Sequence, residues 1–175
     1  MALLLASIIL SSFLHSQDNA KDAWSPLRYF VGEWEGSGEG QSGNSTVKRT
    51  YRFILGEQFL QVGNTSTYPP QQSNPKGEVH SDLGILSYDK ARKTFVARQF
   101  HIEGFVNQYV LDSVSANGKT LVFLTESIEN IPKGWKAKEE YQIVTDDEFV
   151  ETFSLAAPGK EFEVYSTTRL KRKQS

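Results

Sequence analysis

The strongest constraint on the fold is a period-two alternation of apolar and polar residues that continues along most of the chain. This alternation is typical of β-strands with one buried face, because successive side chains point to opposite sides of a sheet. Beyond residue 30, no stretch keeps the 3.6-residue period of an amphipathic helix. Turn-forming residues also recur about every ten positions. The sequence therefore predicts an all-β protein built from short strands.

These turns divide the chain into ten expected strands. We place the strands at residues 33–40, 45–55, 58–67, 79–88, 93–102, 104–113, 119–129, 134–144, 148–156 and 161–172. The separating segments, such as 116–119 and 158–160, contain Asn, Gly and Pro, which favour turns. Before the first strand, Ser25 at the N-cap and Pro26 at the first helical position predict a short helix.

A series of hairpin-connected strands leaves two exposed edges unless it closes on itself. Closure removes these edges, so we expect an up-and-down antiparallel barrel of about ten strands with a short N-terminal helix. The barrel is expected to form a single domain over residues 24–173. The long connection over residues 68–77 contains three prolines and is therefore expected to be a loop at the barrel rim.

The chain begins with an apolar run from Ala2 to Leu14, which is too short to span a bilayer. Such a run is typical of a secretory signal peptide, so we predict a signal peptide over residues 1–16 and a secreted or periplasmic product. The mature chain would then have no integral membrane segment. The alternative is that these residues form a buried N-terminal helix.

The charges are balanced, with 19 Lys and Arg against 21 Asp and Glu. A net charge of −2 provides no basic surface, so no nucleic-acid partner is expected. The absence of cysteine excludes disulfides and thiolate metal sites. No serine lies in a nucleophile-elbow context and no His-x-x-x-His spacing occurs, which favours a binding protein over an enzyme.

Some charged residues share a strand face with large apolar ones. Arg49, Glu139 and Glu151 each have an aromatic residue two positions away on the same face. A buried charge needs a partner, so we expect Arg49 to pair with Glu139 or Glu151 inside the barrel. The same polar groups would also suit a cavity that holds an amphipathic ligand. Both interpretations stay open at this point.

Two histidines fall on strands that are expected to form a hairpin. If residues 89–92 form a symmetric turn, His80 lies opposite His101, and Asp82 lies opposite Gln99 on the same face. Two imidazoles and one carboxylate can form a facial triad for a metal ion. The alternative is a hydrogen-bonded polar cluster across the two strands, so metal binding stays open.

The segment Gly32-Glu33-Trp34 resembles the Gly-x-Trp signature of the calycin superfamily, which includes lipocalins and fatty-acid-binding proteins. The resemblance implies that Trp34 closes one end of the barrel and that Arg169 of the last strand packs across its ring as a cation–π contact. The glycine run that follows Trp34 would let the first strand bend sharply against it.

Nearly the whole chain after the expected signal peptide resembles the nitrobindin-like haem-binding β-barrels. The matching features are Pro26 in a proline-led turn, the run from Gly32 to Gly40, the segment from His80 to Gly84 and the final strand from Tyr165 to Arg172. The resemblance implies haem as a candidate cofactor and places His80 and His101 in the cavity lining. Tyr165 stands where the family has its axial histidine, so Tyr165 and His101 are the candidate axial ligands. The strand pattern leaves open whether Tyr165 points inward.

These features suggest three functions. The first is binding of a small, mainly hydrophobic or amphipathic molecule in the barrel cavity. Its polar lining would consist of His80, Asp82, Gln99, His101, Asn107, Tyr109 and Arg49. The second, implied by the resemblance, is a haem barrel with nitrogen-oxide sensing or peroxynitrite isomerase activity. The third is a structural barrel with a filled interior.

Overall fold

A computed structural model describes residues 23–72 and 74–174. The expected signal peptide over residues 1–16 lies outside the described residues and stays a prediction. The chain consists of two compact units, Met1–Phe30 and Val31–Ser175, which are described separately. No helix within the described ranges is both long enough and apolar enough to cross a bilayer.

The described part of the first unit contains one short helix, α2, over Ser25–Arg28. Pro26 lies in its first turn, as expected, because proline lacks the N–H that a first turn leaves unpaired. The helix begins one residue earlier than we expected, so Trp24 rather than Ser25 occupies the N-cap. The carbonyl of Trp24 accepts hydrogen bonds from the backbone amides of Leu27 and Arg28 at 2.9 and 3.1 Å.

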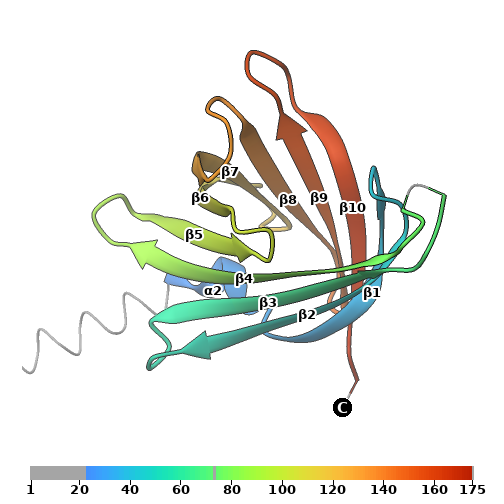
Figure 1. The fold of residues 1–175 in the computed structure, drawn as a ribbon. Coiled ribbons are helices and arrows are strands. Elements are labelled where there is room, and N and C mark those ends of the chain that lie inside the picture. The colour runs from blue at the N-terminus through green and yellow to red at the C-terminus, as the bar shows by residue number, and fades with distance from the viewer. Residues whose placement is uncertain (1–22, 73, 175) are drawn as a thin grey trace, which may run out of the picture. The chain divides into compact units, whose positions relative to one another are not determined.

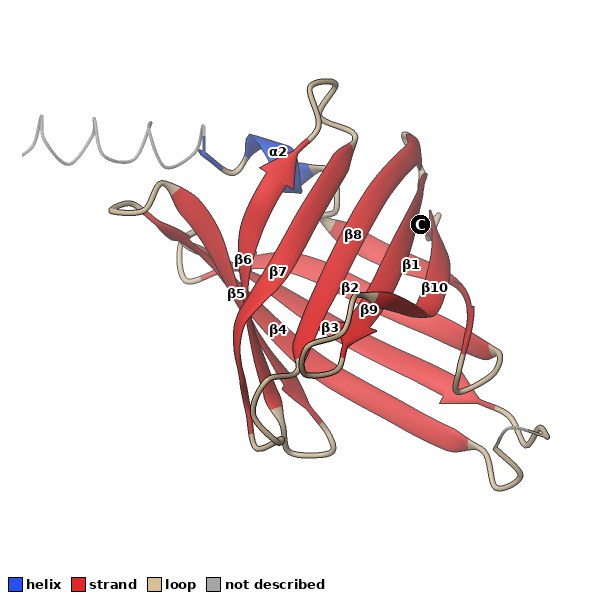
Figure 2. Cartoon of the chain, turned by 90° about the horizontal axis from the view of Figure 1, so that it is seen from above, coloured by secondary structure: helices blue, strands red, loops and turns tan. Residues whose placement is uncertain are grey.

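The second unit is a closed antiparallel barrel of ten strands, which confirms the predicted fold class (Figures 1 and 2). The strands are β1 Gly32–Gly40, β2 Ser45–Ile54, β3 Phe59–Tyr68, β4 Glu78–Asp89, β5 Thr94–His101, β6 Val106–Val114, β7 Thr120–Glu129, β8 Lys136–Thr145, β9 Glu148–Ala156 and β10 Glu163–Arg172. Each strand pairs with the next one in the chain, and β10 pairs with β1. This last pairing closes the sheet and removes its edges.

The two ends of the barrel are formed by different sets of connections. Residues 55–58, 90–93, 115–119 and 146–147 connect strands at the end where β1 begins, which we call the Trp34 end. Residues 41–44, 69–77, 102–105, 130–135 and 157–162 connect strands at the opposite end, which we call the far end. The expected rim loop over residues 68–77 therefore belongs to the far end.

The Trp34 end holds a dense apolar core. Its large inward side chains, each exposed by 3% or less, are Trp34, Leu60, Phe95, Leu121, Phe149 and Leu170. The rings of Trp34 and Phe149 meet edge to face, with their centroids 4.8 Å apart. Such an arrangement is favourable for aromatic pairs and fills the interior at this end.

Arg172, rather than the expected Arg169, packs on Trp34. Its guanidinium carbon lies 4.2 Å from the ring centroid, because Trp34 and Arg172 are direct partners across the β1–β10 ladder. Arg169 lies opposite Ser37 instead, is largely exposed and forms an ion pair with Glu148. The predicted cation–π contact on Trp34 is therefore confirmed, but the arginine that makes it is Arg172, and the prediction of Arg169 was wrong.

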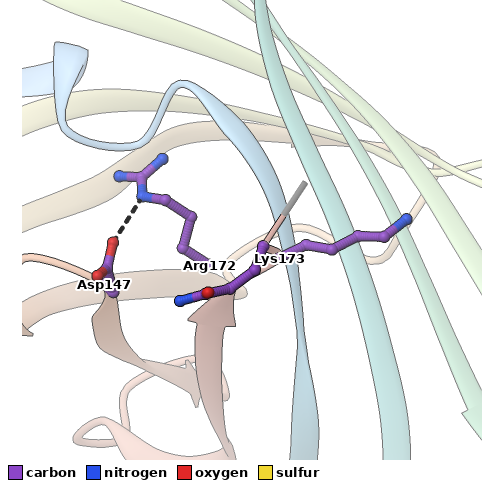
Figure 3. A pocket seen from close by; sticks show the side chains of 4 residues that line it. Asp147, Arg172 and Lys173 are labelled. Carbon is purple, nitrogen blue, oxygen red and sulfur yellow. Dashed lines mark hydrogen bonds and ion pairs between the residues drawn. The ribbon is translucent and has the colours of Figure 1, made fainter.

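Arg172 also fixes the chain around this closure. Its Nη1 donates to the carbonyl of Val31 at 2.8 Å, and its Nε lies 3.2 Å from the Asp147 carboxylate. Figure 3 shows Arg172 and Asp147 facing each other, while Lys173 extends away from them. These residues line a surface pocket of about 230 Å³. Arg172, which lines this pocket, is therefore already held by its contacts with Trp34, Val31 and Asp147.

Two glycines of β1 are required by the close approach of β10. A Cβ atom at Gly36 would lie 1.9 Å from the carbonyl oxygen of Arg169, and one at Gly40 would lie 2.2 Å from that of Tyr165. Only glycine avoids these backbone clashes. The glycine run thus allows β1 and β10 to approach each other closely where the barrel closes.

The β4–β5 hairpin has a different register from the one we expected. Asp89 pairs with Thr94, so the turn consists of residues 90–93 rather than 89–92. The Asp89 carboxylate accepts hydrogen bonds from the amides of Ala91 and Arg92, both at 3.0 Å, which holds Asp89 as the last residue of β4. His101 therefore lies opposite Asp82, and Gln99 lies opposite Gly84. A shift of two residues keeps every side chain on its predicted face.

Candidate functional site

The predicted lining residues come together on the inner faces of three neighbouring strands near the far end. We call this group the polar cluster: His80 and Asp82 on β4, Gln99 and His101 on β5, and Asn107 and Tyr109 on β6. Burial varies within this cluster: Asn107 and Tyr109 are as deeply buried as the core at the Trp34 end, whereas His80 is only partly buried. The side chain of His80 is 23% exposed. The far end thus leaves part of the polar cluster accessible.

Asp82 is held from several sides. Asn64 donates to one carboxylate oxygen and Gln99 donates to the other, both at 2.8 Å. Burial alone would raise the pKa of Asp82, but hydrogen bonds from His80 and the two amides, together with the charge of Arg49, lower that pKa overall. Asp82 is therefore an ionised carboxylate inside the barrel.

His80 lies between two carboxylates. Its Nε2 is 3.4 Å from the Asp82 carboxylate, and its Nδ1 is 2.7 Å from the Glu103 carboxylate. The hydrogen bond with Asp82, assisted by that with Glu103, outweighs burial and raises the pKa of His80 to about 9. His80 consequently carries a positive charge at neutral pH.

His101 is in the opposite electrostatic state. Burial lowers the pKa of its imidazole, so the ring is neutral at pH 7. Its ring stacks on Phe105 with a centroid separation of 4.0 Å, and its Nε2 lies 3.3 Å from Nδ2 of Asn107. Among the described residues, neither Nδ1 of His101 nor Oδ1 of Asn107 has a hydrogen-bond partner, although both atoms are buried. These two atoms are unusual, because buried polar atoms are normally paired.

A chain of ionic and amide contacts extends from the polar cluster across the barrel interior. Arg49 forms an ion pair with Glu151, as the sequence led us to expect, and its Nε donates to Oδ1 of Asn64 at 3.1 Å. Asn64 in turn donates to Asp82. We call Asp82, Asn64, Arg49 and Glu151 the internal network. Arg49 is thus connected to the polar cluster through Asn64.

Glu139 lies near the internal network in a different protonation state. Burial, reinforced by the charge of Glu151, raises the pKa of Glu139 to about 8. Its carboxyl group forms a hydrogen bond with the hydroxyl of Tyr141. Glu139 is therefore predominantly an uncharged acid at neutral pH, while Glu151 is the partner of Arg49 in the ion pair.

Tyr165 belongs to a separate group at the far end. A β-bulge between Val164 and Ser166 inserts Tyr165 into β10. Its ring meets that of the inward residue Phe153 with a centroid distance of 5.8 Å, and its hydroxyl is 2.9 Å from Oγ of Ser42. The bulge explains why strict alternation could not assign Tyr165 to a face.

Two residues that position the polar cluster, Asn64 and Glu103, were not among those predicted from sequence. Asn64 was detectable, because it lies two and four residues from Val62 and Leu60 on an alternating face. Glu103 was not, because it lies in the β5–β6 connection, where alternation gives no orientation. Both residues hold a member of the polar cluster through a hydrogen bond.

Comparison with known proteins provides independent evidence on the fold. Rv2717c from M. tuberculosis has a similar structure, with 19% identity, a TM-score of 0.65, and coverage of 87% of this chain and 98% of that chain. The S-type phycobiliprotein lyase CPES from Guillardia theta is similar at 13% identity and a TM-score of 0.52, with coverage of 84% and 90%. At these identities the likeness shows the barrel fold alone. A search of curated proteins found no match.

A match to a protein-family model shows which family the chain belongs to. The model described as "THAP4-like, heme-binding beta-barrel domain" matches residues 23–172 and so spans all ten strands. This match confirms the resemblance to nitrobindin-like barrels that the glycine run and the His80 segment suggested. The chain therefore belongs to the THAP4-like heme-binding β-barrel domain family.

Proposed function

We propose that the far end of the barrel binds a small, largely apolar molecule and that haem is the leading candidate. The observation that carries the proposal is the pair of buried, unpaired atoms, His101 Nδ1 and Asn107 Oδ1, within the described residues. A buried polar atom without a partner costs about 1–3 kcal/mol. A ligand that supplied the missing partners would recover that cost on binding. The description of the family, which names haem, supports this choice of ligand.

The residues present fit a haem group. His101 offers a neutral imidazole, which is the form that can coordinate iron. Phe105 stacks on this imidazole and Phe153 faces the interior, so aromatic surfaces are available to a flat apolar ligand. Tyr165 offers a phenol oxygen as the alternative iron ligand.

When bound, haem would supply an iron that takes a nitrogen oxide as a further ligand. The chain's own contribution would be to bind and orient. Asn107 would hold the His101 ring through the contact of its Nδ2, which lies 3.3 Å from Nε2 of that ring. The aromatic residues would exclude water from the apolar faces of the ligand.

A titration of the full chain with ferric haem, followed by absorbance, tests this proposal. We expect saturable binding with a shifted Soret band. That band should be lost in His101→Ala if histidine is the iron ligand, or in Tyr165→Phe if the phenol is. Tyr88→Phe is the matched control, because Tyr88 lies near the Trp34 end beside Phe95 and should leave haem binding unchanged.

The outcomes separate the alternatives. If the protein takes up a fluorescent fatty-acid probe but shows no saturable haem binding, the ligand is an apolar molecule other than haem. Failure to bind either compound would contradict the proposal and favour a barrel with a filled interior. Addition of nitric oxide to a haem-loaded sample would then test whether the iron accepts a nitrogen oxide.

A further inference from the structure

We propose that His80, Asp82 and His101 form a binding site for one divalent transition-metal ion of the zinc or ferrous iron type in the haem-free protein. One ligating atom from each of these three residues lies within 4.8 Å of the other two. Ligand distances of about 2.1 Å place the donors of one ion roughly 3–4 Å apart. Small side-chain rotations would therefore bring these three donors onto a common ion.

The three side chains are already held by neighbouring groups. Asn64 and Gln99 each donate a hydrogen bond to the Asp82 carboxylate, and Glu103 binds Nδ1 of His80, which leaves Nε2 facing Asp82. A carboxylate on the second nitrogen of a histidine is the usual support for a metal ligand.

His101 completes the site with a nitrogen that is not otherwise used. Its Nδ1 is buried and has no hydrogen-bond partner in the described part of the chain. Stacking on Phe105 restrains the orientation of the ring. The second unpaired atom, Oδ1 of Asn107, belongs to a side chain that contacts His101 and could accept a hydrogen bond from a water on the ion.

The donor types select the class of metal. Two imidazoles and one carboxylate suit zinc, ferrous iron and similar ions, whereas calcium and magnesium prefer oxygen donors throughout. Three ligands on one side of an ion also leave positions open for water or a small ligand, as in the facial triad of non-haem iron sites. The polar cluster therefore has the composition of a site that keeps open coordination positions.

A neighbouring group of Glu78, His80 and Glu103 could compete for the same ion, because it also brings three donor groups within 4.8 Å. Glu78 and Glu103 are exposed, whereas the Asp82 side chain is only 4% exposed. An exposed carboxylate has water as an alternative partner and gains less from a metal. We therefore assign the ion to the group that contains Asp82 and His101.

The test uses the full chain prepared without haem and treated with a chelator. Titration with Co²⁺, followed by its visible absorption bands, should give one ion per chain, and Zn²⁺ should displace it. We expect Asp82→Asn and His101→Ala to weaken Co²⁺ binding by more than about 100-fold, and Glu103→Gln to weaken it by about 10- to 100-fold. Glu78→Gln is the matched control and should bind as the unchanged protein does.

Far-ultraviolet circular dichroism of each variant distinguishes a lost ligand from a lost fold. If the folded protein binds no Co²⁺, or if Glu78→Gln weakens binding while His101→Ala does not, the assignment is wrong. Metal binding measured without haem does not depend on the proposed haem function. Adding haem to the Co²⁺-loaded protein then tests whether haem and Co²⁺ share a ligand. Displacement of Co²⁺ by haem would identify His101 as the haem-iron ligand, and simultaneous binding of both would indicate Tyr165 as that ligand.

Discussion

His80 and His101 show how partners decide the charge of a residue. Both lie on the inner face near the far end, and their ring centroids are 5.6 Å apart. His80 is protonated because two carboxylates contact it, whereas His101 is neutral because burial is not offset by a close carboxylate contact of that kind. Sequence alone placed the two rings together but could not assign these states.

Glu139 provides a pH test at the scale of a single residue. Its pKa is about 8 in the folded protein, above the ordinary value of 4.5, so the proton is bound more tightly in the folded state. The resulting stabilisation is complete below about pH 4.5 and is lost as the pH rises through about 8. We therefore expect Glu139→Gln, which cannot ionise, to lose less unfolding free energy than the unchanged protein between about pH 5 and 8.

Urea unfolding at several pH values measures this difference. Glu140→Gln is the control, because Glu140 is the next residue on β8 and faces the outside of the barrel. Parallel pH profiles for Glu139→Gln and the unchanged protein would show that Glu139 is already ionised in the folded state.

At the scale of elements, the pairing of β1 with β10 depends on residues that carry no side chain. Gly36 has no room for a Cβ atom, because the β10 backbone occupies that position. The alternating pattern predicted both strands, but it does not reveal how closely two backbones approach. The close approach arises only when β1 and β10 pair, so the sequence of either strand by itself does not predict it.

We predict that Gly36→Ala destabilises the barrel by about 1–3 kcal/mol or more, as overpacking typically does. The new methyl group would lie 1.9 Å from the Arg169 carbonyl oxygen, so the backbone must move. Gly63→Ala is the control, because its Cβ would meet the Thr50 hydroxyl oxygen at 3.0 Å, and a side chain can rotate away. Equal midpoints for the two variants in chemical denaturation would contradict this explanation.

At the scale of the whole barrel, closure depends on the Trp34–Arg172 contact more than on exposed ion pairs. Arg172→Ala removes the cation–π contact and the hydrogen bond to Val31, so we expect a loss of about 2 kcal/mol. Arg169→Ala removes an exposed ion pair with Glu148 and should change stability by less than about 0.5–1 kcal/mol. Denaturation followed by tryptophan fluorescence compares the two, and a larger effect at Arg169 would refute this assignment.

The fold was predictable from sequence because alternation and turn residues are local signals. The same signals identify faces but not partners: the β4–β5 register was wrong by two residues, yet His80, Asp82, Gln99 and His101 still share one face. Arg169 and Arg172 could not be distinguished, because the β10 bulge and the pairing with β1 depend on contacts between distant segments. The wrong choice of arginine has this origin, whereas alternation with Leu60 and Val62 already places Asn64 on the inner face.

The internal network divides the barrel interior into two regions. Between the apolar core at the Trp34 end and the polar cluster near the far end, the Arg49–Glu151 pair and Asn64 provide a charged boundary. An apolar ligand that enters from the far end would have to displace these charges to go deeper, which is costly. Depth of entry, and therefore ligand size, would be limited by this boundary.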